Sequence, residues 1–403
     1  MLDPLPQPAA DALAVSRALS EQIAGEVGAR GGWISFARYM ELALYAPLLG
    51  YYTGGAAKLG KDGDFTTAPE MTPLFGRALA RQIAQILETA PSRILEIGGG
   101  SGGLAADLLL ELEFLRALPE RYSILDLSPD FRDRQKEAIR ERAPHLLDRV
   151  AWLDSLPETI EGAVIGNEVL DAMPVHLVVK SDRGWNERGV TVDSRHGFVF
   201  ADRALAPDGG LDADALDAAL LNAVDSAIGA NDALTVGYTT EIGLAASGFI
   251  AAVADRLAKG VALFIDYGFP RREYYHPQRH AGTLMMHYRH HAHADPFFRP
   301  GLTDITAHVD FSAASNAALR PGAELLGYAS QANFLINCRI TDLASASFAS
   351  SAENPAAWAV QASALQKLLS EAEMGELFKV IAFGRKIDEP LIGFSRGDRS
   401  GSL

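Results

Sequence analysis

Hydrophobic and polar positions alternate between two periods along the chain from residue 77 onward. Amphipathic segments of helical length cover 77–88, 104–118 and 131–142. Apolar runs of strand length cover 93–98, 121–128, 149–155, 162–168 and 261–269. Apolar strands that alternate with helices are typical of a parallel sheet with helices on both faces. The pattern therefore predicts a doubly wound α/β core.

The segments outside this alternation predict additions to the core. Helical spacing predicts helices over 11–29, 34–45, 211–229 and 242–260, alternation with turn residues predicts a hairpin over 184–203, and 378–386 is predicted as a last strand. Residues 50–76 are rich in glycine and aromatic residues, and long loops of this kind are often lids or binding loops. We predict four parts: a helical N-terminal extension and lid (1–76), the core with a hairpin insertion near 180–205 (77–269), a second lid or substrate segment rich in Pro, His and Gly (270–321), and a C-terminal completion of the core (322–403).

Composition and charge narrow the class of protein. A hydrophobic content of 48% with 22% charged residues is ordinary for a globular chain of 403 residues. The formal charge of −15 opposes a nucleic-acid backbone and an anionic membrane surface, so we expect neither as a partner. Cys338 is the only cysteine, which excludes an intramolecular disulfide. The start of the chain resembles neither a signal peptide nor a transit peptide, and we expect a soluble protein in the cytoplasm without membrane insertion.

A glycine loop joins the first predicted core strand to the next helix, in "RILEIGGGSGGLAADLL". Backbone N–H groups at such a junction can meet an anionic or polar ligand. Gly98, Gly100 and Gly103 match the dinucleotide spacing G-x-G-x-x-G. Glu96 with Gly98, Gly100 and Gly102 equally matches the methyltransferase pattern E-x-G-x-G-x-G. The glycines predict a nucleoside-containing cofactor without deciding which one.

Acids at the ends of three predicted strands bear on that choice. Glu96 could meet the cationic methionine end of S-adenosylmethionine, whereas a pyrophosphate would be repelled there. Asp126 can accept hydrogen bonds from both ribose hydroxyls, which either cofactor would need. Asp154 is placed to accept from an adenine amino group, and an exposed turn aspartate is an equally good interpretation.

Several stretches together resemble one family over nearly the whole chain. These are "ISFARYMELALYAPLLGYY", "GDFTTAPEMTPLFG", "LEIGGGSGG", "GNEVLDAMPV", "TDITAHVDF" and "MGELFKV", in this order. They resemble the MidA family of class I methyltransferases, whose mitochondrial members are complex I assembly factors. The resemblance implies a mostly parallel seven-stranded methyltransferase fold, S-adenosylmethionine as cofactor, and arginine N-methylation of a protein partner such as a complex I subunit. The segment "TLMMHYRHHAHADPFF" fits the family only loosely, which puts the acceptor specificity in doubt.

The family's T-x-P-E stretch corresponds to Thr67, Pro69 and Glu70 in the first lid. The resemblance implies that these residues close over the cofactor. A plain helix start is the alternative, because a threonine before a proline and an acid is typical of a helix N-terminus.

Carboxylates follow the apolar run "AVIG" in "AVIGNEVLDAMPVHLV" (163–178). A guanidinium is a delocalised cation that does not simply deprotonate, and carboxylates can hold one side of it by bidentate hydrogen bonds. Glu168 and Asp171, together with Asp266 at the end of the next core strand, are therefore the candidate catalytic acids. The alternative is that each caps a turn. Asn167 either bonds the cofactor or stabilises the turn, and His176 begins the next strand.

Six histidines between 276 and 293 include two pairs at i,i+4 spacing. Pro277, Gly282 and Pro296 disfavour a long helix there, and the segment has no H-E-x-x-H motif, so we expect no metal site.

The leading hypothesis is a protein arginine methyltransferase that uses Glu168 to orient the guanidinium. The alternatives are a non-catalytic assembly chaperone that binds the cofactor, a methyltransferase of a small molecule, and a nucleotide-dependent oxidoreductase. The oligomeric state stays open.

Overall fold

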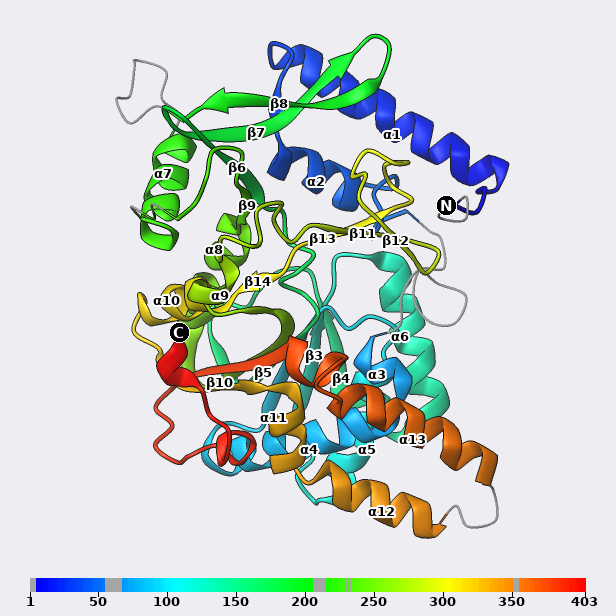
Figure 1. The fold of residues 1–403 in the computed structure, drawn as a ribbon. Coiled ribbons are helices and arrows are strands. Elements are labelled where there is room, and N and C mark those ends of the chain that lie inside the picture. Colours follow the sequence, from blue (N-terminus) through cyan, green and yellow to red (C-terminus); the bar gives the residue numbers. More distant parts are fainter. Residues whose placement is uncertain (1–4, 55–66, 206–214, 230, 232, 351–354) are drawn as a thin grey trace.

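The computed structural model describes residues 5–54, 67–205, 215–229, 231, 233–350 and 355–403. The part of the predicted first lid over 55–66 lies outside these residues. The described chain forms two layers, a core around a large sheet and a second layer above it, which we call the cap layer (Figure 1).

The core sheet confirms the predicted doubly wound, mostly parallel fold. Its strand order is β15-β16-β10-β5-β2-β3-β4, with β14 paired to β10. The strands are β2 (Arg93–Ile97), β3 (Arg121–Leu125), β4 (Val150–Leu153), β5 (Ile160–Asn167), β10 (Leu257–Phe269), β14 (Val309–Asp310), β15 (Glu324–Ser330) and β16 (Phe378–Arg385). Neighbours from β4 to β10 run parallel, and β16 is antiparallel to both β10 and β15. The carboxyl ends of the five parallel strands therefore meet at one edge, where such sheets bind ligands.

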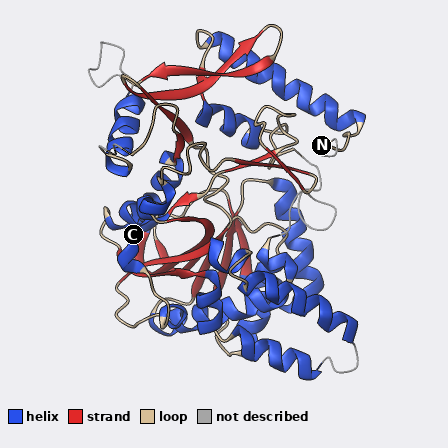
Figure 2. Ribbon diagram, viewed as in Figure 1, coloured by secondary structure: helices blue, strands red, loops and turns tan. Residues whose placement is uncertain are grey.

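Helices cover both faces of this sheet (Figure 2). Alternate side chains of β5 enter opposite clusters, with Ile165 in one and Val164 in the other, because successive strand residues point to opposite faces. The first face is covered by α4 (Pro73–Thr89), α5 (Gly103–Phe114), α6 (Pro129–Arg142), α11 (Gln331–Asn337), α12 (Ile340–Ser350) and α13 (Pro355–Leu369), and the second by α8 (Leu244–Arg256) and α10 (Phe311–Leu319). The remaining short helices are α3 (Ala68–Met71), α9 (Arg271–Tyr274) and α14 (Met374–Leu377), with 3-10 turns at Pro144–Arg149, Ile392–Phe394 and Ser400–Ser402.

The cap layer is built on the predicted hairpin. The hairpin belongs to a larger antiparallel sheet of order β1-β7-β6-β9, with β8 paired to β7. Its elements are α1 (Ala10–Ala29), β1 (Ile34–Ser35), α2 (Phe36–Tyr45), β6 (His176–Ser181), β7 (Gly184–Asp193), β8 (Gly197–Ala204), α7 (Ala215–Ala227) and β9 (Thr239–Ile242). On β6, Leu177 packs toward the cluster of α1 and α2, and Val178 toward the cluster of α7. Because residues 168–175 join β5 directly to β6, this segment carries the chain from the core sheet into the cap layer.

The segment 270–321 is more regular than its sequence pattern indicates. It contains α9, β14, α10 and a small antiparallel sheet of order β12-β11-β13, formed by β11 (Met285–Tyr288), β12 (His291–His293) and β13 (Asp304–Thr306). Met286 and Ile305 are buried against α1 and α2. The strands are only three or four residues long, which is too short for a visible period. Among the described helices, none is long and apolar enough to cross a bilayer.

Candidate functional site

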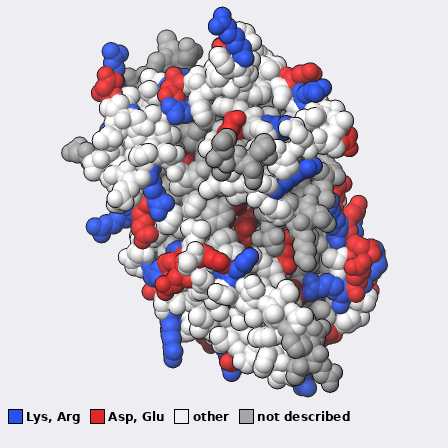
Figure 3. Space-filling view, turned by 45° about the vertical axis from the view of Figure 1, so that its right-hand side comes forward, with Lys and Arg blue, Asp and Glu red and all other residues white. Residues whose placement is uncertain are grey.

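A cavity of about 910 Å³ lies between the carboxyl edge of the core sheet and the cap layer. In the space-filling view, acidic side chains are visible inside a hollow between the two layers (Figure 3). The predicted site residues that line the cavity are Thr67, Pro69, Glu70, Glu96, Gly98, Gly100, Asp126, Asp154, Asn167 and Glu168. Gly102, Asp171 and Asp266 are not among its lining residues.

The glycine loop has a backbone that side chains would not tolerate. Gly98, Gly100 and Gly102 have φ angles of 70°, 50° and 84°, in the left-handed region that favours glycine. A Cβ atom at Gly102 would lie 2.7 Å from Cα of Gln135. Gly102 therefore lets α5 begin close to α6 behind the cavity, while Gly98 and Gly100 present backbone to the cavity itself.

Glu96 is almost fully buried at the end of β2. The Tyr122 hydroxyl donates a hydrogen bond of 2.8 Å to its Oε2. Burial raises the pKa of Glu96 to about 7. A cationic group in the cavity would favour the charged carboxylate, so this position fits the methionine ammonium of the predicted cofactor.

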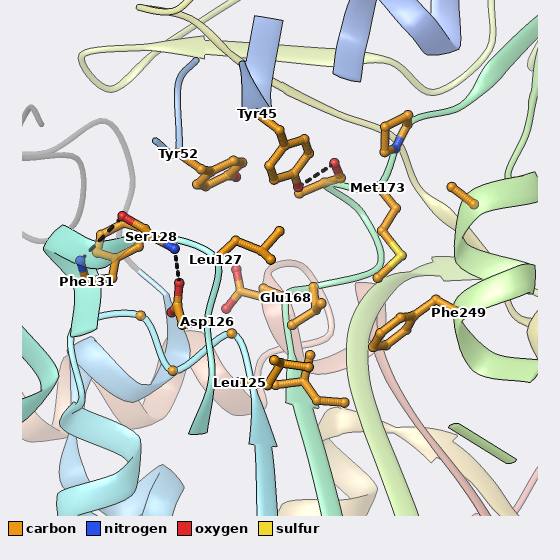
Figure 4. A pocket seen from close by; sticks show the side chains of 18 of the residues that line it. Tyr45, Tyr52, Leu125, Asp126, Leu127, Ser128, Phe131, Glu168, Met173 and Phe249 are labelled. Carbon is orange, nitrogen blue, oxygen red and sulfur yellow. Dashed lines mark hydrogen bonds between the residues drawn. The ribbon is translucent and has the colours of Figure 1, made fainter. Parts of the chain in front are cut away.

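Asp126 is held rigidly at the end of β3. Its Oδ1 accepts from the Ser128 backbone N–H at 3.0 Å, and its Oδ2 accepts from Nε2 of Gln135 at 2.8 Å. Burial is the main cause that raises the pKa of Asp126 above its ordinary value. Gln135 also donates to the Gly100 carbonyl at 3.1 Å, which connects Asp126 to the glycine loop. The carboxylate keeps lone pairs for a ribose diol beside the loop (Figure 4).

Asp154 lies at the rim of the cavity with 92% of its side chain exposed. Nη1 of Arg132 donates to Asp154 at 2.6 Å, and the same guanidinium bonds the carbonyls of Asp126 and Leu153 at 2.6 to 2.8 Å. Of the two interpretations left open by the sequence, this geometry favours the exposed turn aspartate over the adenine contact.

Glu168 is the acid that reaches the cavity from the end of β5. Its φ of 52° is unusual for a residue with a side chain, and its backbone N–H donates to the Ile265 carbonyl at 2.9 Å. Oε1 accepts from Nδ2 of Asn167 at 3.1 Å and from the Ala68 backbone N–H at 3.3 Å. Burial, reinforced by the nearby charge of Asp171, raises the pKa of Glu168 to about 8.

The T-x-P-E stretch meets Glu168 directly. Ala68, which donates to Glu168, lies between Thr67 and Pro69 at the start of α3. Thr67 is the N-cap residue of α3, and Pro69 and Glu70 lie in its first turn, as the helix-start interpretation predicts, although the Thr67 hydroxyl makes no capping hydrogen bond. On the other side of Glu168, Oδ1 of Asn167 is buried and has no hydrogen-bond partner among the described residues. Such an orphaned acceptor at a cavity wall fits a bound donor.

Asp171 and Asp266 lie behind Glu168, which corrects the prediction that all three acids face the reacting atoms. Oδ2 of Asp266 accepts from the backbone N–H groups of Leu170 and Asp171 at 2.9 and 3.2 Å, and Oδ1 accepts from that of Tyr267 at 2.9 Å. Asp171 accepts from the Tyr267 hydroxyl at 2.6 Å. Asp266 is fully buried. Asp266 therefore stabilises the turn that presents Glu168, as the turn-cap alternative predicts. Asp171 is held by Tyr267 instead, and its Oδ1 is buried with no hydrogen-bond partner among the described residues.

Tyr45 and Tyr52 form a wall that sequence reasoning missed. Their rings stack with centroids 5.5 Å apart and lie across the cavity from Asp126 and Glu168 (Figure 4). The Tyr45 hydroxyl donates to the Ala172 carbonyl at 3.0 Å, and that of Tyr52 donates to Oδ1 of Asp304 at 3.0 Å. The aromatic composition of 50–76 indicated a binding loop that contains Tyr52. Tyr45 gave no such signal, because it is the last residue of a predicted helix. Met173 and Phe249 form a further apolar side of the cavity (Figure 4).

Within the described ranges, no group of three or more His, Cys, Asp and Glu side chains is arranged to hold a metal ion. The polar groups that line the cavity instead suit an organic cofactor. Glu96 is placed to bind an ammonium, Asp126 is placed to bind a ribose diol, and the glycine loop offers backbone for close contact.

Comparisons with known proteins also indicate a nucleoside-containing cofactor. Residues 77–329 match a family model described as an S-adenosyl-L-methionine-dependent methyltransferase. A crystal structure of a Burkholderia thailandensis protein bound to S-adenosyl-homocysteine is 52% identical, has a TM-score of 0.91, and aligns over 99% of this chain and 100% of that chain. The zebrafish (Danio rerio) protein arginine methyltransferase NDUFAF7, mitochondrial, is 27% identical over 91% of this chain and 86% of its own length. Its human (Homo sapiens) counterpart is 26% identical over 87% and 80%.

Proposed function

The chain belongs to the MidA family of methyltransferases, with S-adenosylmethionine as cofactor, and we propose that it methylates an arginine of a partner protein. The cofactor supplies a methyl group on a sulfonium sulfur. The names of the zebrafish and human relatives support the choice of a protein arginine as acceptor. Following the resemblance, we propose a respiratory complex I subunit as the first partner to test. The cytoplasmic location stays a prediction.

The observation that carries the proposal is the carboxyl group of Glu168 in the cavity wall. Ala68 and Asn167 donate to its Oε1, whereas Oε2 accepts no hydrogen bond from any described residue. A carboxylate fixed in this way can bind one edge of a guanidinium and draw positive charge away from the nitrogen that attacks. The free pKa of a guanidinium lies above about 12, so orientation and charge localisation, rather than deprotonation, are what the site has to supply.

The other lining residues support methyl transfer by positioning and by excluding water. Tyr45, Tyr52, Met173 and Phe249 make the wall around Glu168 largely apolar. Methyl transfer to nitrogen is an in-line displacement, which depends on holding the acceptor at attacking distance in a dry site. Glu96 and Asp126 would hold the cofactor at its amino and ribose ends.

Labelled methyl transfer tests this function. The purified protein is incubated with S-adenosylmethionine carrying a labelled methyl group and a lysate of source cells that lack the gene. We expect one dominant labelled protein band, with methylarginine found by mass spectrometry. Label on a small molecule or on another amino acid would favour the small-molecule alternative or a different acceptor. An unlabelled lysate, with binding of S-adenosyl-homocysteine verified by calorimetry, would favour the assembly chaperone.

Asp126→Asn is expected to weaken binding of S-adenosyl-homocysteine by about 10- to 100-fold, because hydrogen bonds from hydroxyls to a charged acceptor are worth roughly 1.5–3 kcal/mol. Asp154→Asn is the matched control and should change the affinity by less than about threefold, since its side chain is exposed and paired with Arg132. Titration calorimetry measures both affinities. An equal loss in the two variants would restore the adenine contact to Asp154, and an unchanged affinity in Asp126→Asn would remove the ribose assignment.

A further inference from the structure

His176 lines the same cavity from the cap layer, where it begins β6. The imidazole is buried, and its Nδ1 lies 2.7 Å from Oε1 of Glu187 on β7. Its other nitrogen, Nε2, makes no hydrogen bond with any residue in the described part of the chain. The ring of His176 is thus fixed through Nδ1, and its Nε2 has no partner among the described residues. Such a polar atom at a cavity wall fits a bound ligand.

The contacts of Glu187 determine which nitrogen of His176 carries the proton. Nη2 of Arg203 donates to Oε2 of Glu187 at 3.0 Å, and a guanidinium is always a charged donor. Glu187 beside it is a carboxylate, which can only accept hydrogen bonds. The hydrogen between Glu187 and His176 therefore belongs to Nδ1. In the neutral ring, Nε2 then offers a lone pair to the cavity.

The support behind this pair is rigid. Arg203 also donates to Oδ1 of Asp217 at 2.7 Å, and its guanidinium carbon lies 4.4 Å from the ring centroid of Trp33. Glu187 is 1% exposed, so water does not compete for its oxygens. A carboxylate that fixes the ring and the tautomer of a histidine is a recurring way to orient its second nitrogen toward a ligand.

We infer that His176 is a recognition residue for the methyl acceptor, whose N–H donates a hydrogen bond to Nε2. The inference rests on the proposed function, because it takes the acceptor to be a peptide. Arg38 and Glu41 line the same cavity, but they are bound to each other at 2.7 Å, and Arg38 is also bound to Glu26. The open acceptor of His176 is therefore available to an incoming donor.

The position of His176 indicates the size of that acceptor. Glu168 directly follows a core strand, whereas His176 begins a strand of the cap layer, so an acceptor that contacts both spans the cavity from one layer to the other. A polypeptide provides such a ligand, with an arginine side chain for Glu168 and a further N–H for His176. Glu187 and Arg203 are positioning residues in this arrangement.

The test compares two replacements of His176 in the labelled lysate assay at limiting lysate. His176→Asn keeps a donor for Glu187 but removes the acceptor at Nε2, and we expect about a tenfold lower initial rate on the labelled arginine band. His176→Gln can place a carbonyl oxygen near the position of Nε2 and should recover part of that rate. Both variants should bind S-adenosyl-homocysteine like the unmodified protein. His145→Asn, an exposed histidine paired with Glu113, is the control that should change nothing.

A second measurement examines the unmodified protein. Long-range ¹⁵N–¹H spectra of histidine-labelled protein, with His176 assigned by its absence in His176→Asn, should show a proton on Nδ1 and a bare Nε2. A proton on Nε2, in the neutral or in the charged ring, or an arginine band labelled equally fast by His176→Asn, would overturn the inference. If the unmodified protein labels no arginine, the proposed function fails instead, and the tautomer still reports on His176 independently.

Discussion

Replacement of Glu168 by glutamine is expected to lower the rate of methyl transfer by about a thousandfold, because one preorganised charged group at a developing charge contributes roughly 10²- to 10³-fold or more. Glutamine has nearly the same shape and can still accept from Ala68 and Asn167. It lacks the negative charge that binds and polarises a guanidinium. The affinity for S-adenosyl-homocysteine should stay within about threefold, since we propose Glu96 and Asp126, not Glu168, as the acids that hold that ligand. The labelled lysate assay and calorimetry measure the two quantities.

The Glu168→Gln variant should fold and should be at least as stable as the unmodified protein. The pKa of Glu168 is raised from 4.5 to about 8, so the folded protein holds the proton more tightly than the unfolded chain does. The stability that this proton provides is fully present below pH 4.5 and is lost as the pH rises to about 8. Glutamine stays neutral throughout, and Glu168→Gln should therefore melt at a higher temperature than the unmodified protein at pH 8.

Glu137→Gln provides the matched control, because Glu137 is an exposed glutamate of α6 outside the cavity. It should transfer methyl groups at the normal rate. If Glu168→Gln also kept the normal rate, Glu168 would not contact the acceptor. If it lost cofactor affinity together with activity, its role would lie in the cofactor site.

The core could be predicted because its local pattern and its tertiary structure agree. The central parallel strands β2, β5 and β10 are mostly buried on both faces and are therefore nearly continuous apolar runs. The strand β15 was not predicted from the sequence. It is an edge strand with a register shift between Leu325 and Gly327, and its first half is only partly buried, so it has no continuous apolar run. The hairpin of β7 and β8 was correctly predicted. The strands β1, which pairs with β7, and β9, which pairs with β6, are only two and four residues long, and such short strands are fixed by pairing rather than by their own pattern.

The candidate site could likewise be predicted only in part. The glycine loop and the acids at strand ends follow from sequence, since residues after parallel strands converge on one edge. The sequence favoured Glu168 as the acid that contacts the acceptor, but it did not indicate that Asp171 and Asp266 lie outside the cavity lining. That outcome depends on the left-handed backbone at Glu168 and on the three backbone N–H groups that Asp266 accepts. His176 similarly became a candidate only when Glu187, from a different strand, was found beside it.

Methyl transfer is expected to depend steeply on pH. Glu168 is neutral below a pKa of about 8, which burial and the charge of Asp171 have raised, and only its charged form binds a guanidinium well. The initial rate at saturating cofactor and limiting acceptor should therefore fall by about tenfold for each pH unit below the pKa of the cofactor complex, and level off above it. The positive sulfonium of the bound cofactor should lower that pKa below 8. Rates of the unmodified protein between pH 6 and 9 measure this slope, and the residual rate of Glu168→Gln should not follow it.

Proton release on cofactor binding separates Glu168 from other acids without any acceptor. S-adenosylmethionine and S-adenosyl-homocysteine share the ammonium that would face Glu96, whose pKa of about 7 is raised by burial. Both should therefore release the same fraction of a proton from that residue near pH 7.5, about a quarter at most. Only S-adenosylmethionine carries the sulfonium charge, which favours ionisation of Glu168. Calorimetry at pH 7.5 in buffers of different ionisation enthalpy should therefore show up to about three quarters of a proton more for S-adenosylmethionine. In Glu168→Gln the two ligands should release equal amounts, and a difference that persists there would mean that the sulfonium acts on another group.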